Sequence, residues 1–258
     1  MFMAKEYVSW RFKAHGKAGV HPPFLFRLCD KVFSRKNQIP EQERIESIRR
    51  KLLNDTRTIE VQDFGAGSKV SGTHLRSIAE IAKGSAKTKK WAAVLYQLAA
   101  DLRPSQIIEL GTSLGISTLY MASAIPSGKV ISLEGCANIS REARKNVQDA
   151  GLSNVEIRTG HFDETLPLLL AETQAVEFAY IDGNHTEAAT LRYFELFKHK
   201  ATDYTVLIFD DIHWSEGMKN AWGKIIRDEQ VRLSVDFFQL GMVFFNRGLS
   251  KQHFNIRL

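Results

Sequence analysis

Acidic residues follow two apolar runs in the second half of the chain, at places where strands of a sheet would end. Asp182 follows "VEFAYI", and Asp210 and Asp211 follow "TVLIF". Ligands of open α/β sheets bind at the carboxyl ends of the strands, so acids at two such ends can converge on one ion. Mg²⁺ takes oxygen ligands and keeps several waters, so few carboxylates suffice. The pattern predicts a metal site made of these three acids, with loop capping or salt bridges as their alternative role.

A glycine-bearing turn, "ELGTSLGIS" over residues 109–117, follows another apolar run. A triphosphate-binding loop would need a lysine after the second glycine, and a dinucleotide-binding loop would need GxGxxG, so the turn matches neither. Gly111 has no side chain, and a ligand can therefore approach its backbone closely. Ser117 and the amides that open the next helix can receive a carboxylate, while Glu109 can receive an ammonium group. The turn favours a ligand with the charged groups of an amino acid.

A second acid extends this reasoning to a nucleoside. The apolar run "KVISLE" ends in Glu134, twenty-five residues after Glu109. An acid at this strand end commonly accepts the hydroxyls of a ribose. An amino acid joined to a nucleoside is S-adenosylmethionine, so the turn and the two acids together predict this cofactor.

Five motifs give the chain, from about Ile81 onward, a resemblance to class I S-adenosylmethionine-dependent methyltransferases, specifically to the catechol O-methyltransferase-like branch. They are "GSAK" (84–87), the turn over 109–117, "GHFDETLP" (160–167), "YIDGNH" and "IFDD". In that branch the corresponding segments lie beside the cofactor, near its adenine and at the metal. The resemblance implies an enzyme that transfers a methyl group, with the help of Mg²⁺, to an oxygen of a small hydroxylated molecule.

The resemblance also implies roles for individual residues. Cofactor binding is implied for Lys83, Glu109, Gly111, Thr112, Gly115, Ser117, Glu134, His161, Phe162 and Asp182. His161 and Phe162 would lie near the adenine. Asp182 would act in catalysis as well, next to the metal.

The chain departs from the branch at two positions. Where the branch has a lysine that removes the proton of the acceptor, three residues after the first metal-binding aspartate, this chain has His185. A neutral imidazole, with an ordinary pKa of ~6.5, accepts a proton near neutral pH. His185 is therefore the predicted base and His213 the alternative, with a surface-loop role open for both. Asp211 stands where the branch often has asparagine, so it either adds a carboxylate or faces away. Trp214 and Trp222 are candidate walls of the acceptor pocket, with packing as the alternative.

Alternating runs predict the elements that position these residues. Near-continuous apolar strands alternate with amphipathic helices, as in a doubly wound α/β domain. We expect a Rossmann-like, mostly parallel, seven-stranded sheet with a C-terminal antiparallel hairpin in "LSVDFFQLGMVFFN", Gly241 being near its turn. The predicted strands are 106–110, 129–134, 155–160, 176–182 and 205–211. Helices are predicted before this sheet over 22–33, 40–53, 76–82 and 89–102.

Charge is distributed unevenly along the chain. Residues 1–90 carry 19 Lys and Arg against 9 Asp and Glu, whereas residues 91–258 carry 16 against 20. We predict a basic, helical cap over 1–72 and a methyltransferase domain that binds S-adenosylmethionine over 73–258. The basic residues favour a solvated helical face, and methylation of nucleic acid through this segment is the first alternative function. A noncatalytic protein that keeps the cofactor-binding fold is the second.

The remaining features limit the class of protein. No apolar run approaches the ~20 residues that span a bilayer, and the first residues lack the apolar core of a signal peptide, so we expect a cytoplasmic protein without a membrane partner. Cys29 and Cys136 form no CxxC pair and are expected to be reduced thiols. A homodimer is a further expectation. "DFGAGS" (63–68) is interpreted as a glycine turn before a helix, and "HPPF" (21–24) as the start of a helix.

Overall fold

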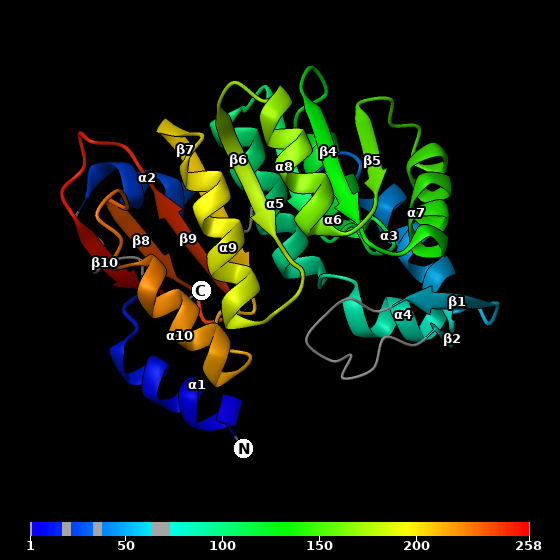
Figure 1. Ribbon diagram of the computed structural model, residues 1–258, viewed down its shortest axis with the longest axis horizontal. Coiled ribbons are helices and arrows are strands. Elements are labelled where there is room, and N and C mark those ends of the chain that lie inside the picture. The colour runs from blue at the N-terminus through cyan, green and yellow to red at the C-terminus, as the bar shows by residue number, and fades with distance from the viewer. Residues whose placement is uncertain (1, 17–21, 33–37, 63–72, 258) are drawn as a thin grey trace. The chain divides into compact units, whose positions relative to one another are not determined.

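The computed structural model describes residues 2–16, 22–32, 38–62 and 73–257 (Figure 1). The chain divides into two compact units. One consists of Met1–Phe33 and Leu169–Leu258, and the other of Ser34–Leu168. The segment "DFGAGS" lies outside the described residues, so its interpretation as a glycine turn stays a prediction, as does the division into domains at residue 72.

Eight strands form one mostly parallel sheet. They are β3 (Gln106–Leu110), β4 (Lys129–Glu134), β5 (Val155–Thr159), β6 (Val176–Ile181), β7 (Ala201–Asp210), β8 (Leu233–Asp236), β9 (Leu240–Phe244) and β10 (Gln252–Asn255). In the Ser34–Leu168 unit the order is β3-β4-β5, all parallel. In the other unit the order is β10-β8-β9-β7-β6, in which only β9 is antiparallel to its neighbours.

The predicted fold class is confirmed, including the C-terminal hairpin of β8 and β9. The hairpin turn consists of residues 237–239, and Gly241 lies next to it within β9. A side chain at this position would collide with Trp222, since a Cβ would lie 2.7 Å from the indole ring. The eighth strand, β10, was not predicted, because four residues reading "QHFN" carry neither an apolar run nor a clear alternation.

Along the chain, helices precede the strands of the sheet and alternate with them. They are α1 (Phe2–Lys13), α2 (Pro23–Val32), α3 (Gln42–Leu53), α4 (Ile78–Ser85), α5 (Lys89–Leu102), α6 (Ile116–Ala124), α7 (Ala137–Asp149), α8 (Phe162–Glu172), α9 (Glu187–Lys198) and α10 (Glu216–Ile225). The four helices predicted ahead of the sheet are present as α2 to α5. Sequence reasoning missed α1, whose apolar residues form no single stripe, and the antiparallel pair β1 (Thr58–Gln62) and β2 (Thr73–Ser77). No described helix is both long enough and apolar enough to span a bilayer.

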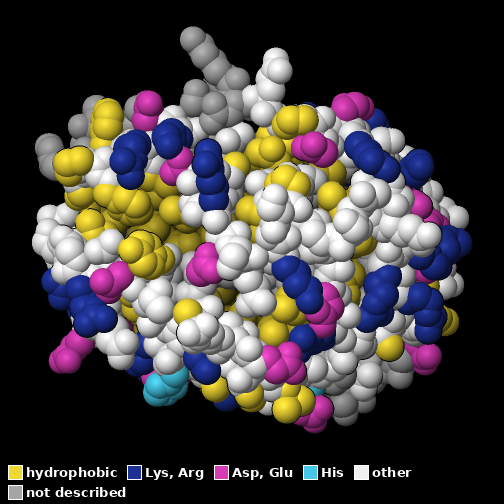
Figure 2. Space-filling model, turned by 90° about the horizontal axis from the view of Figure 1, so that it is seen from above, with side chains coloured by type: hydrophobic (Ala, Val, Ile, Leu, Met, Phe, Trp, Pro, Cys, Tyr) yellow, Lys and Arg dark blue, Asp and Glu magenta, His cyan; other side chains and the backbone are white. Residues whose placement is uncertain are grey.

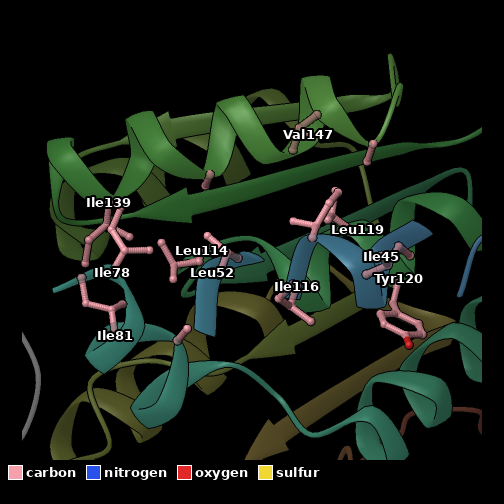
Figure 3. Packing of buried hydrophobic residues seen from close by; sticks show 14 of the residues in the cluster. Ile45, Leu52, Ile78, Ile81, Leu114, Ile116, Leu119, Tyr120, Ile139 and Val147 are labelled. Atoms are coloured by element: carbon pink, nitrogen blue, oxygen red, sulfur yellow. The ribbon is translucent and has the colours of Figure 1, made fainter. Parts of the chain in front are cut away.

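A hydrophobic cluster joins α3 to the elements that carry the glycine turn (Figure 3). α3 contributes Ile45, Ile48 and Leu52 to this cluster, and all three are buried. Their partners come from α4, α6, α7 and the turn itself. The partners labelled in the figure are Ile78, Ile81, Leu114, Ile116, Leu119, Tyr120, Ile139 and Val147. A hydrogen bond from the Tyr120 hydroxyl to Glu46 Oε1 (2.8 Å) adds a polar contact within the same unit. Residues before the recognisable motifs therefore help to build the core around the turn.

Ile45→Ala is expected to lower the free energy of unfolding by about 2–5 kcal/mol, because it leaves a cavity in this cluster. Urea denaturation followed by circular dichroism measures the loss. Leu53→Ala is the matched control, since Leu53 is only partly buried at the edge of the same cluster. Equal losses in the two variants would contradict the larger contribution expected of Ile45 to this core.

Candidate functional site

The turn after β3 has a left-handed backbone at three of its five residues. Gly111, Ser113 and Gly115 have φ angles of 95°, 48° and 88°. The first two amides of the turn, those of Gly111 and Thr112, donate to the Leu133 carbonyl of β4 at 3.0 and 3.2 Å. Gly115 then starts α6 as its N-cap residue. Glycine adopts these angles without steric cost, which explains the two glycines and leaves the backbone of the turn open to close approach.

Glu109 is completely buried beneath this turn, and three hydroxyls donate to its carboxylate. Ser117 Oγ lies 2.5 Å from Oε1, while Thr118 Oγ1 and Ser132 Oγ lie 2.5 and 2.6 Å from Oε2. These bonds tie β3 to α6 and β4. The ligand-binding roles predicted for Glu109 and Ser117 stay predictions, and the two side chains contact each other directly.

Glu134, at the end of β4, lies against the same turn. Its Oε2 accepts the Ser113 amide at 2.8 Å, and its Oε1 accepts the Cys136 amide at 3.0 Å. Burial raises the pKa of the Glu134 carboxyl above its ordinary value, although the hydrogen bonds from backbone amides act in the opposite direction. Sequence reasoning placed this acid at a strand end, and the structure brings it into contact with the turn.

Two further predicted segments meet the turn and Glu134. The Gly160 amide donates to the Glu134 carbonyl at 2.9 Å, which places the partly buried His161 and Phe162 directly after this contact. Ser85, in the "GSAK" motif, shares a hydrogen bond of 2.5 Å with Ser113 Oγ. Four motifs that lie far apart in the sequence therefore converge within the Ser34–Leu168 unit. Lys83 lies on the exposed surface of α4.

In the other unit, a tyrosine hydroxyl joins two of the predicted metal ligands. Tyr180 Oη lies 2.9 Å from Asp182 Oδ2 and 3.2 Å from Asp210 Oδ2. Tyr180 is fully buried on β6. A single hydroxyl proton faces two carboxylates here, and a cation would stabilise such a pair of like charges. Sequence reasoning missed Tyr180, although its position two residues before Asp182 on a strand places both side chains on one face.

His185 contacts one of these two acids, and Asp211 directly follows the other in the sequence. His185 Nε2 lies 3.5 Å from Asp182 Oδ1. Asp211 has a left-handed backbone (φ 53°), and its amide donates to the Gln239 carbonyl at 2.7 Å. Within the described part of the chain, no group of three or more His, Cys, Asp and Glu side chains is arranged to hold a metal ion. Asp182 and Asp210 nevertheless fit Mg²⁺ as two oxygen ligands, because this ion completes its shell with water.

His213, the alternative base, is held by a different acid. Its Nε2 lies 2.7 Å from Asp236 Oδ2, which also accepts Trp222 Nε1 at 3.2 Å. Trp222 is buried against Gly241, so it contributes to packing, whereas Trp214 is 55% exposed. Of the two histidines, His185 is the one that lies beside a predicted metal ligand.

Known proteins share both sequence and fold with this chain. Residues 108–212 match the family described as a methyltransferase domain. A catechol O-methyltransferase from Niastella koreensis is 35% identical over 120 residues, which span 45% of this chain and 53% of that relative. An O-methyltransferase from Bacillus cereus, solved with S-adenosylhomocysteine, aligns over 86% of this chain and 97% of its own, with a TM-score of 0.58 and 19% identity. A methyltransferase from Podospora anserina, also bound to S-adenosylhomocysteine, aligns over 88% and 99%, with a TM-score of 0.62 and 12% identity.

The predicted resemblance to class I methyltransferases of the catechol O-methyltransferase-like branch is confirmed by the matched domain and the Niastella relative. The solved structures share the fold of the chain. The chain spans about half the length of the curated relative that it matches over the longest stretch.

Proposed function

We propose that this chain, whose residues 108–212 match a methyltransferase domain, is an S-adenosylmethionine-dependent O-methyltransferase that acts on a small hydroxylated molecule. The observation that carries the proposal is the convergence of three other segments on the turn after β3. Glu134, Ser85 and the segment starting at Gly160 all contact this turn or its acid through hydrogen bonds.

In this proposal the turn and its neighbours hold the cofactor. Its amino-acid part lies along the backbone of Gly111 to Gly115, its ribose at Glu134, and its adenine beside His161 and Phe162. Thr112 and Ser117 help to fix the turn, because their hydroxyls bond to Ser132 and Glu109. Lys83 and Asp182 remain proposed contacts of the cofactor.

The acids after β6 and β7 would hold a divalent cation such as Mg²⁺, with Asp182 and Asp210 as ligands and Asp211 as the adjoining third acid. When bound, such an ion lowers the pKa of a hydroxyl in its shell. His185 accepts the proton of the acceptor hydroxyl, and Asp182 orients the imidazole from 3.5 Å. The deprotonated oxygen would then attack the methyl carbon in line with the sulfur, so that a C–O bond forms as the C–S bond breaks and S-adenosylhomocysteine leaves.

A direct test is incubation of the purified protein with labelled S-adenosylmethionine, Mg²⁺ and a panel of small hydroxylated molecules. Formation of S-adenosylhomocysteine together with a labelled methyl ether supports the proposal. Tight cofactor binding without turnover on any acceptor would favour the noncatalytic alternative.

The nucleic-acid alternative has a separate test. On the face shown in Figure 2, described Lys and Arg side chains alternate with Asp and Glu, and hydrophobic side chains gather on one part of the face. Binding to phosphates through many basic residues gives an affinity that falls steeply with salt. Filter binding with RNA and DNA at two salt concentrations would detect it, and methylated nucleic acid as the product would replace the small acceptor. The homodimer and the cytoplasmic location also stay proposals.

Glu134→Ala is expected to weaken binding of S-adenosylmethionine by about 1–3 kcal/mol, because it removes the proposed acceptor of the ribose hydroxyls. Since burial raises the pKa of Glu134, its carboxyl becomes protonated, and a poorer acceptor, as the pH falls through that raised value. The unmodified chain should therefore bind S-adenosylmethionine with its full affinity above this pKa and more weakly below it. Isothermal titration calorimetry between acidic and neutral pH measures both effects.

The control is Glu156→Ala, which removes an acid from the adjacent strand β5. Glu156 pairs with Lys129 and Arg158 instead of the turn, so its removal should leave cofactor affinity unchanged. A Glu134→Ala variant with unaltered affinity and pH dependence would remove this residue from the cofactor site.

A further inference from the structure

Three residues other than glycine adopt left-handed backbone conformations after consecutive parallel strands in the Met1–Phe33 and Leu169–Leu258 unit. Asn184, Asp211 and Phe238 have φ angles of 53°, 53° and 72° and follow β6, β7 and β8. β8 runs parallel to β7 because both are antiparallel to β9, so the three residues lie along one edge of this part of the sheet. Asparagine and aspartate tolerate such angles, but a bulky aromatic residue does so rarely. Strain of this kind persists only where the surrounding structure holds the residue in place.

The ring of Phe238 explains why an aromatic residue occupies this strained position. It makes an edge contact with Tyr7 (ring centroids 5.0 Å apart) and a tilted contact with Trp10 (5.5 Å), and it stacks on His213 (5.0 Å, interplanar angle 7°). Tyr7 and Trp10 come from α1, and His213 comes from the loop after β7. Glycine would relieve the backbone at position 238, but it would lose all three contacts.

The backbone of the same turn holds the residue that follows Asp210. The Phe238 amide donates to Asp236 Oδ1 at 2.7 Å, and the carbonyl of the next residue, Gln239, accepts the Asp211 amide at 2.7 Å. A change in the position of Phe238 would therefore move the carbonyl that fixes Asp211, and with it the end of β7.

α1 is itself attached to the same unit at two points. Near its start, Glu6 Oε1 accepts Lys219 Nζ of α10 at 2.7 Å, and α1 lies beside α10 in Figure 1. Just after its end, the His15 amide donates to the Asn255 carbonyl at 2.9 Å, and the Arg257 amide donates to the His15 carbonyl at 3.0 Å. The aromatic side chains of α1 are thus presented to Phe238 from a firmly held helix.

We propose that Phe238 is a positioning residue through which α1 fixes the acidic end of β7. α1 holds the ring, the ring holds the strained turn, and the turn holds the backbone of Asp211. The consequence for methyl transfer rests on the proposed function: loosening α1 or Phe238 impairs use of the acceptor and leaves cofactor binding intact, because the proposed cofactor turn belongs to the other unit.

The test compares amide hydrogen exchange in the full-length protein and in four variants. In Phe238→Ala and in Trp10→Ala, the Asp211 amide should exchange at least about tenfold faster, since each lost aromatic pair lowers the cost of local opening. Phe238→Tyr keeps the ring and should restore slow exchange. Phe24→Ala is the matched control, because it removes another edge-on aromatic pair (Phe24 with Phe244, 5.3 Å) of the same unit.

Unchanged exchange at Asp211 in a folded Phe238→Ala protein would overturn the proposal, as would equal acceleration in Phe24→Ala. If Phe238→Ala does not fold, Trp10→Ala carries the same test from the α1 side. Kinetics then supply a second readout: the KM for the acceptor should rise or kcat should fall, with an unchanged Kd for S-adenosylmethionine. The exchange experiment needs no turnover, so an inactive parent protein would contradict the proposed function without affecting this result.

Discussion

Asp182→Ala and Asp210→Ala are each expected to lower methyl transfer by about 10³-fold or more, because each removes one of two carboxylates proposed to hold a cation worth several kcal/mol in the transition state. Both acids contact the Tyr180 hydroxyl, so each variant leaves a single one of these two carboxylates beside this hydroxyl. The affinity for S-adenosylmethionine should remain largely intact. Radiometric assays give the turnover, and calorimetry gives the affinity.

Asp203→Ala is the matched control for this experiment. Asp203 lies near the opposite end of β7, is partly exposed and pairs with Arg247, so its removal should leave turnover unchanged. EDTA should abolish the activity of the unmodified protein, and Mg²⁺ or Mn²⁺ should restore it. Full activity in EDTA would exclude a metal from the mechanism, and an active Asp210→Ala variant would exclude the proposed ligand pair.

Gly111→Val is expected to weaken binding of S-adenosylmethionine by at least about 100-fold, since a β-branched residue at a φ of 95° strains the backbone and fills the space beside the turn. The amide of Gly111 also donates to Leu133, so a distorted turn would lose its attachment to β4. Calorimetric titration with S-adenosylmethionine and S-adenosylhomocysteine measures the effect.

Gly223→Ala provides the control for glycine replacement. Gly223 lies in α10, and the nearest atoms to an added Cβ belong to the side chain of Arg227, 3.6 Å away. Alanine favours a helix over glycine, so this variant should bind the cofactor normally. Unaltered affinity in a folded Gly111→Val protein, or tighter binding of NAD than of S-adenosylmethionine, would contradict the proposed cofactor.

Local patterns in the sequence were sufficient to predict the central elements of the sheet. β3, β4, β6 and the last six residues of β7 are short apolar runs that are almost entirely buried, and such runs are visible without knowledge of their partners. β5 is only partly buried. The ends of these strands could be located in the sequence, and Glu134, Asp182 and Asp210 lie at or directly after them. This was possible because the carboxyl end of a parallel strand can be recognised from the strand itself. The turn over 109–117 was equally visible, since its glycines are required by left-handed backbone angles at Gly111 and Gly115.

Only the tertiary structure decided which side chains these residues contact. The Tyr180 hydroxyl between the two acids, the hydroxyls around Glu109, and the bond between His213 and Asp236 all depend on the packing of separate elements. α1 carries no clear amphipathic stripe, so its sequence did not indicate that Tyr7 and Trp10 contact Phe238, more than 220 positions later. The physical reason is that strand formation and turn geometry follow from neighbouring residues, whereas contacts between distant segments arise only when the whole chain buries its apolar surface.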